Sequence, residues 1–253
     1  MFKHIGKQFS IFPRRIFICA LAALATINAA HAVTSLEQID RLGEVYGAVL
    51  DYRPASIPGP RPQGQVEVAA EADLVPSINN RIGAKIEPVQ TSPVIGRVRM
   101  DWSPISGVRL GGYLIPPVTV MNTKALLYGL QAEYGWGENK IRSSARIHMT
   151  HGNIEGPFSA ADTSDQFFLD ASGIDLRSGW FVEKWVMYAG IGLGNNRTQF
   201  RMGADGAVID GSHVYRYAMA GVGWKNGPWT LVAEQQHTLN YLSNVIFTVT
   251  YGF

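Results

Sequence analysis

The last ten residues of the chain, NVIFTVTYGF (244–253), alternate strictly in the kind of side chain that they carry. Successive side chains of a β-strand point to opposite faces of the sheet. One face is therefore aliphatic and aromatic, and it consists of Val245, Phe247, Val249, Tyr251 and Phe253. The other face is mostly small and polar. A strand with lipid outside it and a polar lumen inside it has this pattern, so the segment predicts the final strand of a transmembrane β-barrel.

The first 32 residues have the three parts of a secretory signal peptide. Four Lys and Arg residues precede an apolar run, Ile16–Leu24, and Ala30-His31-Ala32 matches an A-x-A cleavage site. The apolar run is shorter than the roughly 20 residues that a transmembrane helix needs. We therefore expect residues 1–32 to be removed during export.

Removal of that peptide changes the chemistry of the chain. The single cysteine, Cys19, lies within it, so the mature chain has no disulfide. Taking four basic residues from the 22 leaves 18 against 20 acidic ones, a net charge of −2 instead of +2. No basic patch indicates nucleic-acid binding. No run of 18 apolar residues follows the signal, so no transmembrane helix is expected.

Residues 33–64 form a separate N-terminal region. Apolar residues recur at helical spacing across Ser35–Asp51, and four prolines make Arg53–Gly64 an irregular linker. We expect this helix to lie against the periplasmic mouth of the barrel; the alternative is a plug inside the lumen. The predicted organisation is thus a signal peptide (1–32), a helix with a linker (33–64) and a barrel domain (65–253).

Period-2 alternation recurs throughout the remaining chain. It predicts strands at 66–74, 97–102, 108–114, 126–136, 141–149, 174–180, 185–193, 212–224, 229–240 and 244–253. Short connections alternate with long ones, as in a barrel with tight periplasmic turns and long outer loops. The longest outer loops are expected at Pro76–Pro93, His151–Ala171 and Asn196–Gly211. The fold class is therefore all-β, an antiparallel up-and-down transmembrane barrel of about ten strands, with eight or twelve as alternatives.

Tryptophan gives an independent indication of the same orientation. All six tryptophans flank the four short turns, and their parity places them on the outer face. Indole rings favour the interface between membrane and water. We therefore predict an aromatic girdle at the periplasmic interface: Trp102, Trp136, Trp180, Trp185, Trp224 and Trp229.

With its signal peptide, alternating strands and terminal Tyr251-Gly252-Phe253, the chain resembles the Gram-negative outer-membrane β-barrel proteins as a class, over residues 66–253. The resemblance implies location in the bacterial outer membrane, with its lipid and lipopolysaccharide as partners. It also implies delivery by periplasmic chaperones and insertion by the barrel assembly machinery. That machinery reads the terminal strand, so Val249, Tyr251 and Phe253 are the expected assembly signal.

The inward-facing positions carry charges of both signs in near balance. The predicted lumen network consists of Glu67, Glu71, Asp73, Arg97, Arg99, Asp101, Arg109, Glu133, Arg142, Arg146, His148, Asp175, Arg177 and Glu234. Ten strands enclose a lumen only slightly wider than one that side chains can fill. Two hypotheses stay open: a salt-bridged closed interior, or a narrow porin-like channel for small solutes. The glycines at 190, 192 and 194 favour the second by leaving room.

A closed barrel would act as a structural protein, or as a surface-binding or adhesive protein through its outer loops. A hydrolase is a third possibility, but the His-x-Ser motif of outer-membrane phospholipases and deacylases is absent. A rim resembling that of the omptin proteases would have to use His151, Asp162, Asp165, Asp205, Asp210 and His213. Asp, Gly and Ser also simply make solvated loops. We expect no catalytic site, no metal site and no cofactor.

Overall fold

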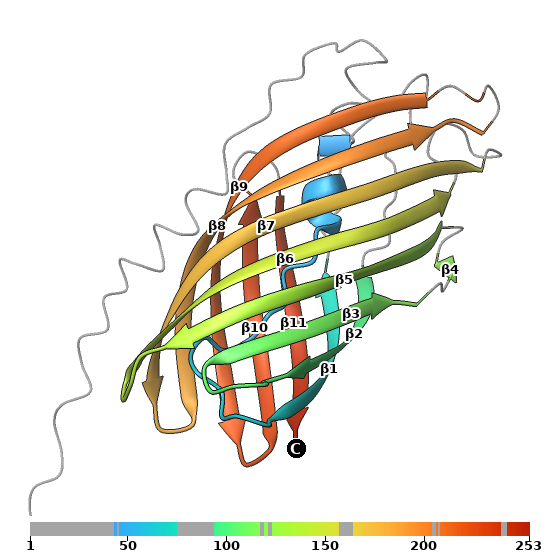
Figure 1. Ribbon diagram of the computed structural model, residues 1–253. Helices are drawn as coiled ribbons and strands as arrows, with labels where there is room; N and C mark the ends of the chain where they lie inside the picture. The colour runs from blue at the N-terminus through green and yellow to red at the C-terminus, as the bar shows by residue number, and fades with distance from the viewer. Residues whose placement is uncertain are drawn as a thin grey trace, which may run out of the picture. The chain divides into compact units, whose positions relative to one another are not determined.

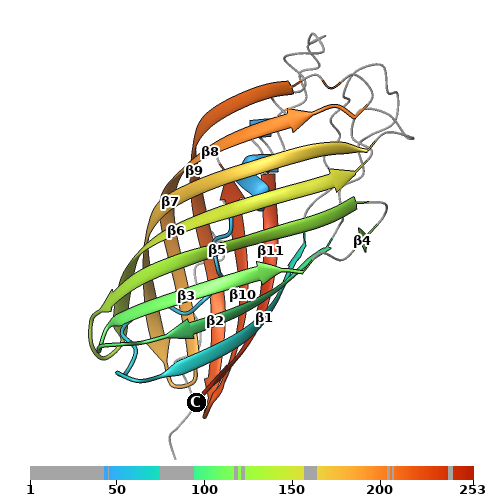
Figure 2. The same cartoon turned by 45° about the vertical axis from the view of Figure 1, so that its right-hand side comes forward.

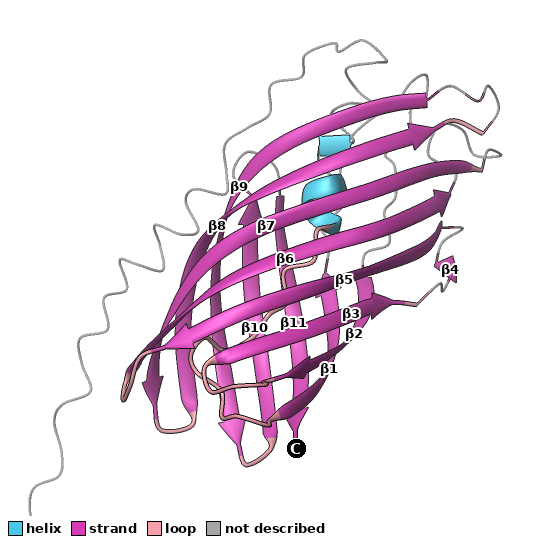
Figure 3. Cartoon of the chain, in the orientation of Figure 1, coloured by secondary structure: helices cyan, strands magenta, loops and turns pink. Residues whose placement is uncertain are grey.

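The computed structural model describes residues 43–44, 46–74, 94–116, 119–120, 123–156, 164–203, 206, 208–238 and 242–253. The predicted signal peptide (1–32), the predicted outer loop at 76–93, Asp162 and Asp205 lie outside these residues. In the part of the chain that the structure describes, no helix is long and apolar enough to cross a membrane. A short helix occupies residues 43–44 and 46–50 (Figure 3).

The strands form one antiparallel sheet that closes on itself (Figures 1 and 2). They are β1 (Val66–Leu74), β2 (Val94–Trp102), β3 (Val108–Ile115), β4 (Thr119–Val120), β5 (Thr123–Trp136), β6 (Ile141–Gly156), β7 (Asp165–Val182), β8 (Trp185–Arg201), β9 (Val208–Asn226), β10 (Trp229–Thr238) and β11 (Leu242–Gly252). Consecutive strands pair from β1 to β3 and from β5 to β11, β3 pairs with β5, and β1 pairs with β11. The two-residue β4 only extends the edge of β5. The predicted ten-strand barrel is confirmed.

Four tight turns lie at one end of the barrel, which we call the turn end, together with the C-terminus (Figure 1). Two of these turns place non-glycine residues in the left-handed region, Asn139 at φ 56° and Glu183 at φ 55°. Such backbone twist suits the short connection of two strands. The opposite end is called the far end below.

In the half of the wall nearer the turn end, side chains alternate as the sequence predicts. Outward positions are large, apolar and exposed, such as Leu130 (61% exposed) and Ile191 (68% exposed). Five of the six tryptophans are exposed on this surface, and Trp224 is half-buried. Inward positions are charged and buried. A closed strand wall with an apolar outer belt satisfies its backbone within itself, as lipid requires.

Towards the far end, the alternation of β6–β9 reverses. In β7, Ile174 and Leu176 face outwards near the turn end, whereas Phe167 and Leu169 face inwards near the far end and Asp170 faces outwards. The inner surface there is an apolar cluster with a polar outer side, as in a water-soluble sheet. These strands have 16, 18, 17 and 19 residues. A membrane crossing needs only about 9–11.

This reversal corrects two predicted loops. The segments 151–171 and 196–211 were expected to be long outer loops, but β6 continues to Gly156, β7 begins at Asp165, β8 continues to Arg201 and β9 begins at Val208. The lipid-type alternation ends near residues 150, 172 and 195. The strands themselves continue because their apolar side chains now face inwards.

Inward glycines of β8 do not leave the space that the sequence suggested. The Tyr217 ring of β9 lies against Gly192, and the Tyr215 ring lies against Gly194. Both rings are buried. The absence of a side chain at these two glycines allows an aromatic ring to pack against each of them, because a Cβ atom at either position would overlap that ring.

The substitution Gly192→Ala should therefore destabilise the barrel by about 1–3 kcal/mol, since the Tyr217 ring must move. Urea unfolding of the refolded mature chain, followed by tryptophan fluorescence, measures this change. Gly96→Ala is the matched control, because a Cβ at Gly96 meets nothing within 4 Å. Equal midpoints for the two variants would contradict the seating of Tyr217 on Gly192.

Candidate functional site

The lumen contains a stretch of the chain's own N-terminal region, residues 46–64, which we call the plug segment (Figure 3). It runs from the far end to the turn end. Three contacts mark its course, given from the far end to the turn end. Gly47 packs closely against the Asn196 side chain of β8, and the Tyr52 amide donates to Thr150 Oγ1 of β6 (2.9 Å). The Gly107 amide, next to β3, donates to the Arg61 carbonyl (3.0 Å). The plug segment thus traverses the barrel from end to end.

This position differs from the expected one, in which the helix lies at the periplasmic mouth. The helix is seated within the far half because its apolar side chains match the inner lining there. Tyr46 and Leu50 are buried in one cluster with Phe167, Leu169 and Phe200. A helix with this apolar face gains by leaving water and entering that lining.

Below the helix, Asp51 is the centre of a buried polar cluster. Its carboxylate lies 2.8 Å from His148 Nε2, accepts a hydrogen bond from Thr150 Oγ1 (3.2 Å) and accepts another from the Tyr215 hydroxyl. The carboxylate of Asp51 thus has partners on β6 and β9 and is fully paired in the interior.

Next along the plug segment, Arg53 enters a pocket formed by two tyrosines of β9. Its guanidinium carbon lies 4.4 Å from the centre of the Tyr217 ring and 5.8 Å from that of Tyr215. It also donates to the Ala48 carbonyl (2.7 Å). Arg53 is only 1% exposed, and the π-faces compensate part of the desolvation of its charge.

Ser56 connects the plug segment to two wall arginines. Its hydroxyl accepts from Arg109 (2.8 Å) and from Arg177 (3.0 Å), and its carbonyl accepts from Arg177 (2.9 Å). Both arginines also pair with Glu133, Arg177 at 2.6 Å. One carboxylate and one serine therefore hold two cations together in the middle of the lumen.

A second group of wall charges lies on β1 and β2. Arg97 pairs with Asp73 (2.8 Å), and Arg99 pairs with Glu71 (2.5 Å) and Asp101 (2.9 Å). These side chains are at most 1% exposed. Arg97–Asp73 and Arg99–Glu71 join diagonal positions of β1 and β2, which the register brings together, whereas Arg99 and Asp101 lie two residues apart on the same face of β2. The wall therefore pairs these charges within itself, and the plug segment adds the Tyr52 ring, whose centre lies 5.1 Å from the guanidinium carbon of Arg97.

Further round the wall, Arg146 pairs with Asp175 (2.7 Å), and Glu234 accepts from Tyr188 (2.6 Å) and Gln236 (2.6 Å). At the turn end, Glu67 lies 3.2 Å from Arg61 of the plug segment. Charges of both signs thus interleave along the half of the lumen nearer the turn end.

The predicted lumen residues all face inwards and are buried, apart from Arg142, which is half-buried and stacks on Phe181 at 4.3 Å. Sequence reasoning missed the partners on the plug segment, namely Asp51, Arg53 and Ser56. It also missed the inward tyrosines. The alternation of the strands could have identified these tyrosines. Tyr188, Tyr215 and Tyr217 occupy the positions that alternate with the outward tryptophans and apolar side chains, so their side chains point inwards.

The residues proposed for a protease-like rim do not converge. His151 faces outwards and pairs with Asp170 of β7, and both are exposed. Asp165 is fully buried and accepts from the Gly203 amide (3.0 Å). Asp210 is exposed and accepts from Gln199 (3.0 Å). The described members of this set therefore lie on different sides of the wall.

The terminal residues complete the seam between the first and last strands. The Phe253 amide donates to the Val66 carbonyl (2.8 Å), and the Tyr251 ring lies 4.8 Å from the rings of Trp229 and Phe253. The expected assembly signal is thus an outward aromatic cluster at the turn end.

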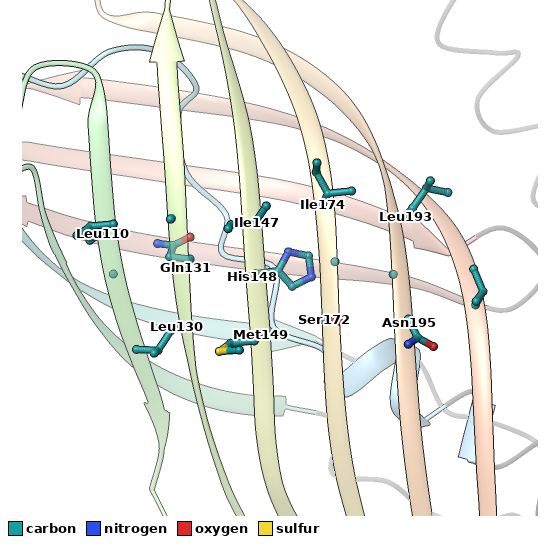
Figure 4. A pocket seen from close by; sticks show the side chains of 15 residues that line it. Leu110, Leu130, Gln131, Ile147, His148, Met149, Ser172, Ile174, Leu193 and Asn195 are labelled. Carbon is teal, nitrogen blue, oxygen red and sulfur yellow. The ribbon is translucent and has the colours of Figure 1, made fainter.

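The wall also has a hollow of about 790 Å³, but it lies on the outer surface (Figure 4). Its lining is almost entirely apolar and includes Leu110, Leu130 and Ile174. Gln131 and His148 border the hollow only through their backbone side of the wall, because their side chains are buried in the lumen. The hollow is part of the lipid-facing belt, and the polar site is the lumen.

No protein-family model matches the sequence, and no curated protein matches it. Solved structures with a similar arrangement of strands include three outer-membrane proteins. Ail, the attachment invasion locus protein of Yersinia pestis, is 10% identical over 76% of this chain and 99% of its own, with a TM-score of 0.32. The KdgM porin is 9% identical over 75% and 99%, with a TM-score of 0.32. The outer-membrane protease OmpT from Escherichia coli is 9% identical over 75% and 94%, with a TM-score of 0.39.

The class of this protein follows from its own wall. A closed antiparallel barrel with an apolar outer belt, tryptophans near its tight turns and a charged lumen is an outer-membrane β-barrel. The resemblance drawn from the sequence is confirmed at this level.

The substitution Arg97→Met should lower the free energy of unfolding by about 3–5 kcal/mol, because it leaves the buried carboxylate of Asp73 unpaired. Adding Asp73→Asn should restore part of that loss, since the remaining group is neutral and still accepts from Asn244. The control is His151→Ala in the exposed His151–Asp170 pair, expected to change the free energy by less than about 1 kcal/mol. Urea unfolding of refolded protein measures all three, and a double variant no more stable than Arg97→Met would contradict the argument.

The substitution Asp51→Asn should destabilise the barrel by about 1–3 kcal/mol at pH 7, because His148 and Tyr215 lose a charged acceptor. Urea unfolding of refolded protein at pH 7 measures this change. Asp170→Asn, in the exposed His151–Asp170 pair, is the matched control and should change the free energy by less than about 1 kcal/mol. Equal effects of the two substitutions would contradict this role.

Proposed function

We propose that this protein is a porin-like barrel of the bacterial outer membrane whose narrow polar lumen is closed by its own plug segment. The observation that carries the proposal is the contact between that segment and the charged wall. Five wall side chains form hydrogen bonds with the segment: Arg109, Arg146, Thr150, Arg177 and Gln236. In an open lumen these polar groups would be free to bind a polar solute. Rings of both charges suit small polar solutes once the segment moves.

The charge pairs of the wall support the proposal that the plug segment leaves without unfolding the barrel. Most wall carboxylates have an arginine partner on the wall itself, such as Asp73, Glu71 and Glu133. Removal of the segment leaves Arg109 and Arg177 paired with Glu133. The wall therefore keeps most of its charge pairs when the segment leaves, which supports replacement of the plug by water.

A second candidate function is a closed barrel that binds a partner at the cell surface. It is favoured by the far half of β6–β9, which extends beyond the length of a membrane crossing and has a polar outer side. In both cases we propose that the turn end is periplasmic and that lipid and lipopolysaccharide surround the wall. We also propose that periplasmic chaperones deliver the chain and that the barrel assembly machinery reads its terminal strand. The signal peptide at 1–32 stays a prediction. We propose no catalytic role.

A disulfide lock tests the gating. In a hypothetical Gly43→Cys variant, the new Cβ would lie 3.5 Å from that of Thr198, a separation that suits a disulfide. The mature chain has no other cysteine if residues 1–32 are removed. We expect the oxidised Gly43→Cys/Thr198→Cys protein to be silent in a planar bilayer. Reduction should give single-channel steps, more frequent when Asp51→Asn and Arg53→Ala also weaken the plug.

The matched control is the same pair of plug-weakening substitutions without the cysteines, which should conduct under both redox conditions. If the reduced and weakened protein remains silent while its barrel is heat-modifiable and resistant to protease, the lumen does not conduct. The surface-binding function would then be the better conclusion.

A further inference from the structure

We propose that the lumen wall is a binding site for an extended, arginine-containing peptide, and that the plug segment is its tethered occupant. The inference rests on the proposed function and deepens it, because it names the ligand class that the lumen takes. Three features carry it: recognition of the main chain, a pocket for one guanidinium group, and a tether that approaches from one end only.

The wall recognises the main chain of the plug segment. Thr150 accepts from the Tyr52 amide, Gln236 donates to the Arg53 carbonyl (2.8 Å), Arg146 donates to the Pro54 carbonyl (2.5 Å) and Arg177 donates to the Ser56 carbonyl. The partners come from β6, β7 and β10, on different sides of the lumen. Main-chain contacts of this kind give affinity for an extended peptide largely independent of its side chains.

The bound conformation costs the segment little entropy. Prolines at 54, 58, 60 and 62 restrict the unbound segment to extended backbone, which is the conformation that the wall contacts. A pre-organised ligand loses less freedom on binding. The same property would favour other proline-containing peptides.

Specificity comes from the pocket that holds Arg53. Tyr215 and Tyr217 provide ring faces, and the Tyr217 hydroxyl donates to Asp175 (3.2 Å), which keeps a negative charge close to the rings. The adjacent His148 and Tyr215 bind Asp51. The wall therefore binds a specific pair of side chains, an acidic one and, two residues later, an arginine.

The covalent link between plug and wall lies at the turn end. Pro62, Gln63 and Gly64 are exposed there, beside a hollow that Gln65 and Phe253 also line. A protease site inserted between Gln63 and Gly64 can be cut after the full mature chain has folded. The plug then remains bound only by its contacts with the wall.

The test is exchange of the cut plug. The cleaved, detergent-solubilised protein is incubated with a fluorescently labelled synthetic peptide of residues 46–62, YGAVLDYRPASIPGPRP, and binding is followed by fluorescence anisotropy. We expect the cut plug to remain with the barrel on gel filtration and the labelled peptide to replace it in a saturable manner. A peptide carrying Arg53→Ala should bind about 30-fold more weakly, as loss of a desolvated cation–π contact implies.

A peptide carrying Arg61→Ala is the matched control. Arg61 is an arginine of the same peptide, and its partner Glu67 also lies 3.6 Å from Arg109 of the wall. Because Glu67 keeps Arg109 when Arg61 is lost, we expect this peptide to lose much less affinity than the roughly 30-fold expected for Arg53→Ala. Because the change is made on the peptide, the barrel is identical in all arms and its folding does not affect the comparison.

Two outcomes overturn the inference: a cut plug that dissociates and is not replaced, or equal binding of the original, Arg53→Ala and Arg61→Ala peptides. Either result leaves the gated pore standing if current steps appear after reduction of the disulfide-locked protein. Saturable exchange without any conductance would instead remove the pore and keep the peptide site.

Discussion

The rest of the structure depends on the pairing of charges that a narrow barrel buries. Each inward arginine or carboxylate loses hydration, and only a close partner of opposite sign compensates that cost. The register of neighbouring strands supplies most partners, as in Arg97 with Asp73, and the plug segment supplies the rest through Asp51, Arg53 and Ser56. The lumen is therefore a complete polar interior, in which the N-terminal region has the role that solvent has in an open pore.

The outer side of the wall suits lipid near the turn end and water towards the far end, along the same strands. Near the turn end its apolar side faces lipid and its polar side faces the lumen; towards the far end, this arrangement is inverted, as the inward Phe167 and Leu169 of β7 show. The helix of the N-terminal region lies in the inverted part, where its apolar side chains meet an apolar lining. The polar half of the plug segment lies at the level of the charges. One strand pattern therefore determines where each half of the segment can lie.

Much of this was predictable, because lipid imposes strict alternation on every crossing strand. The terminal strand, the count of ten and the inward charges such as Arg146 and Asp175 followed from parity alone. The far halves of β6–β9 did not, since reversed alternation rich in Gly, Asp and Ser resembles a loop. Asp51 and Arg53 were also missed: nothing in a proline-rich stretch shows that it will meet His148 and Tyr217, which are about 100 or more residues away in sequence. Such contacts depend on closure of the whole wall.

The seam between β1 and β11 has a consequence for how the molecule is assembled. The plug segment directly precedes β1 in sequence, whereas β11 is the last strand to be made, and their pairing closes the sheet. The segment is thus present before the ring of strands is complete. The simplest order of events is one in which the wall wraps round the segment, so that no chain end has to thread through a finished barrel. In that order the segment serves as a core for the growing sheet, in the way that a central helix does for a soluble domain.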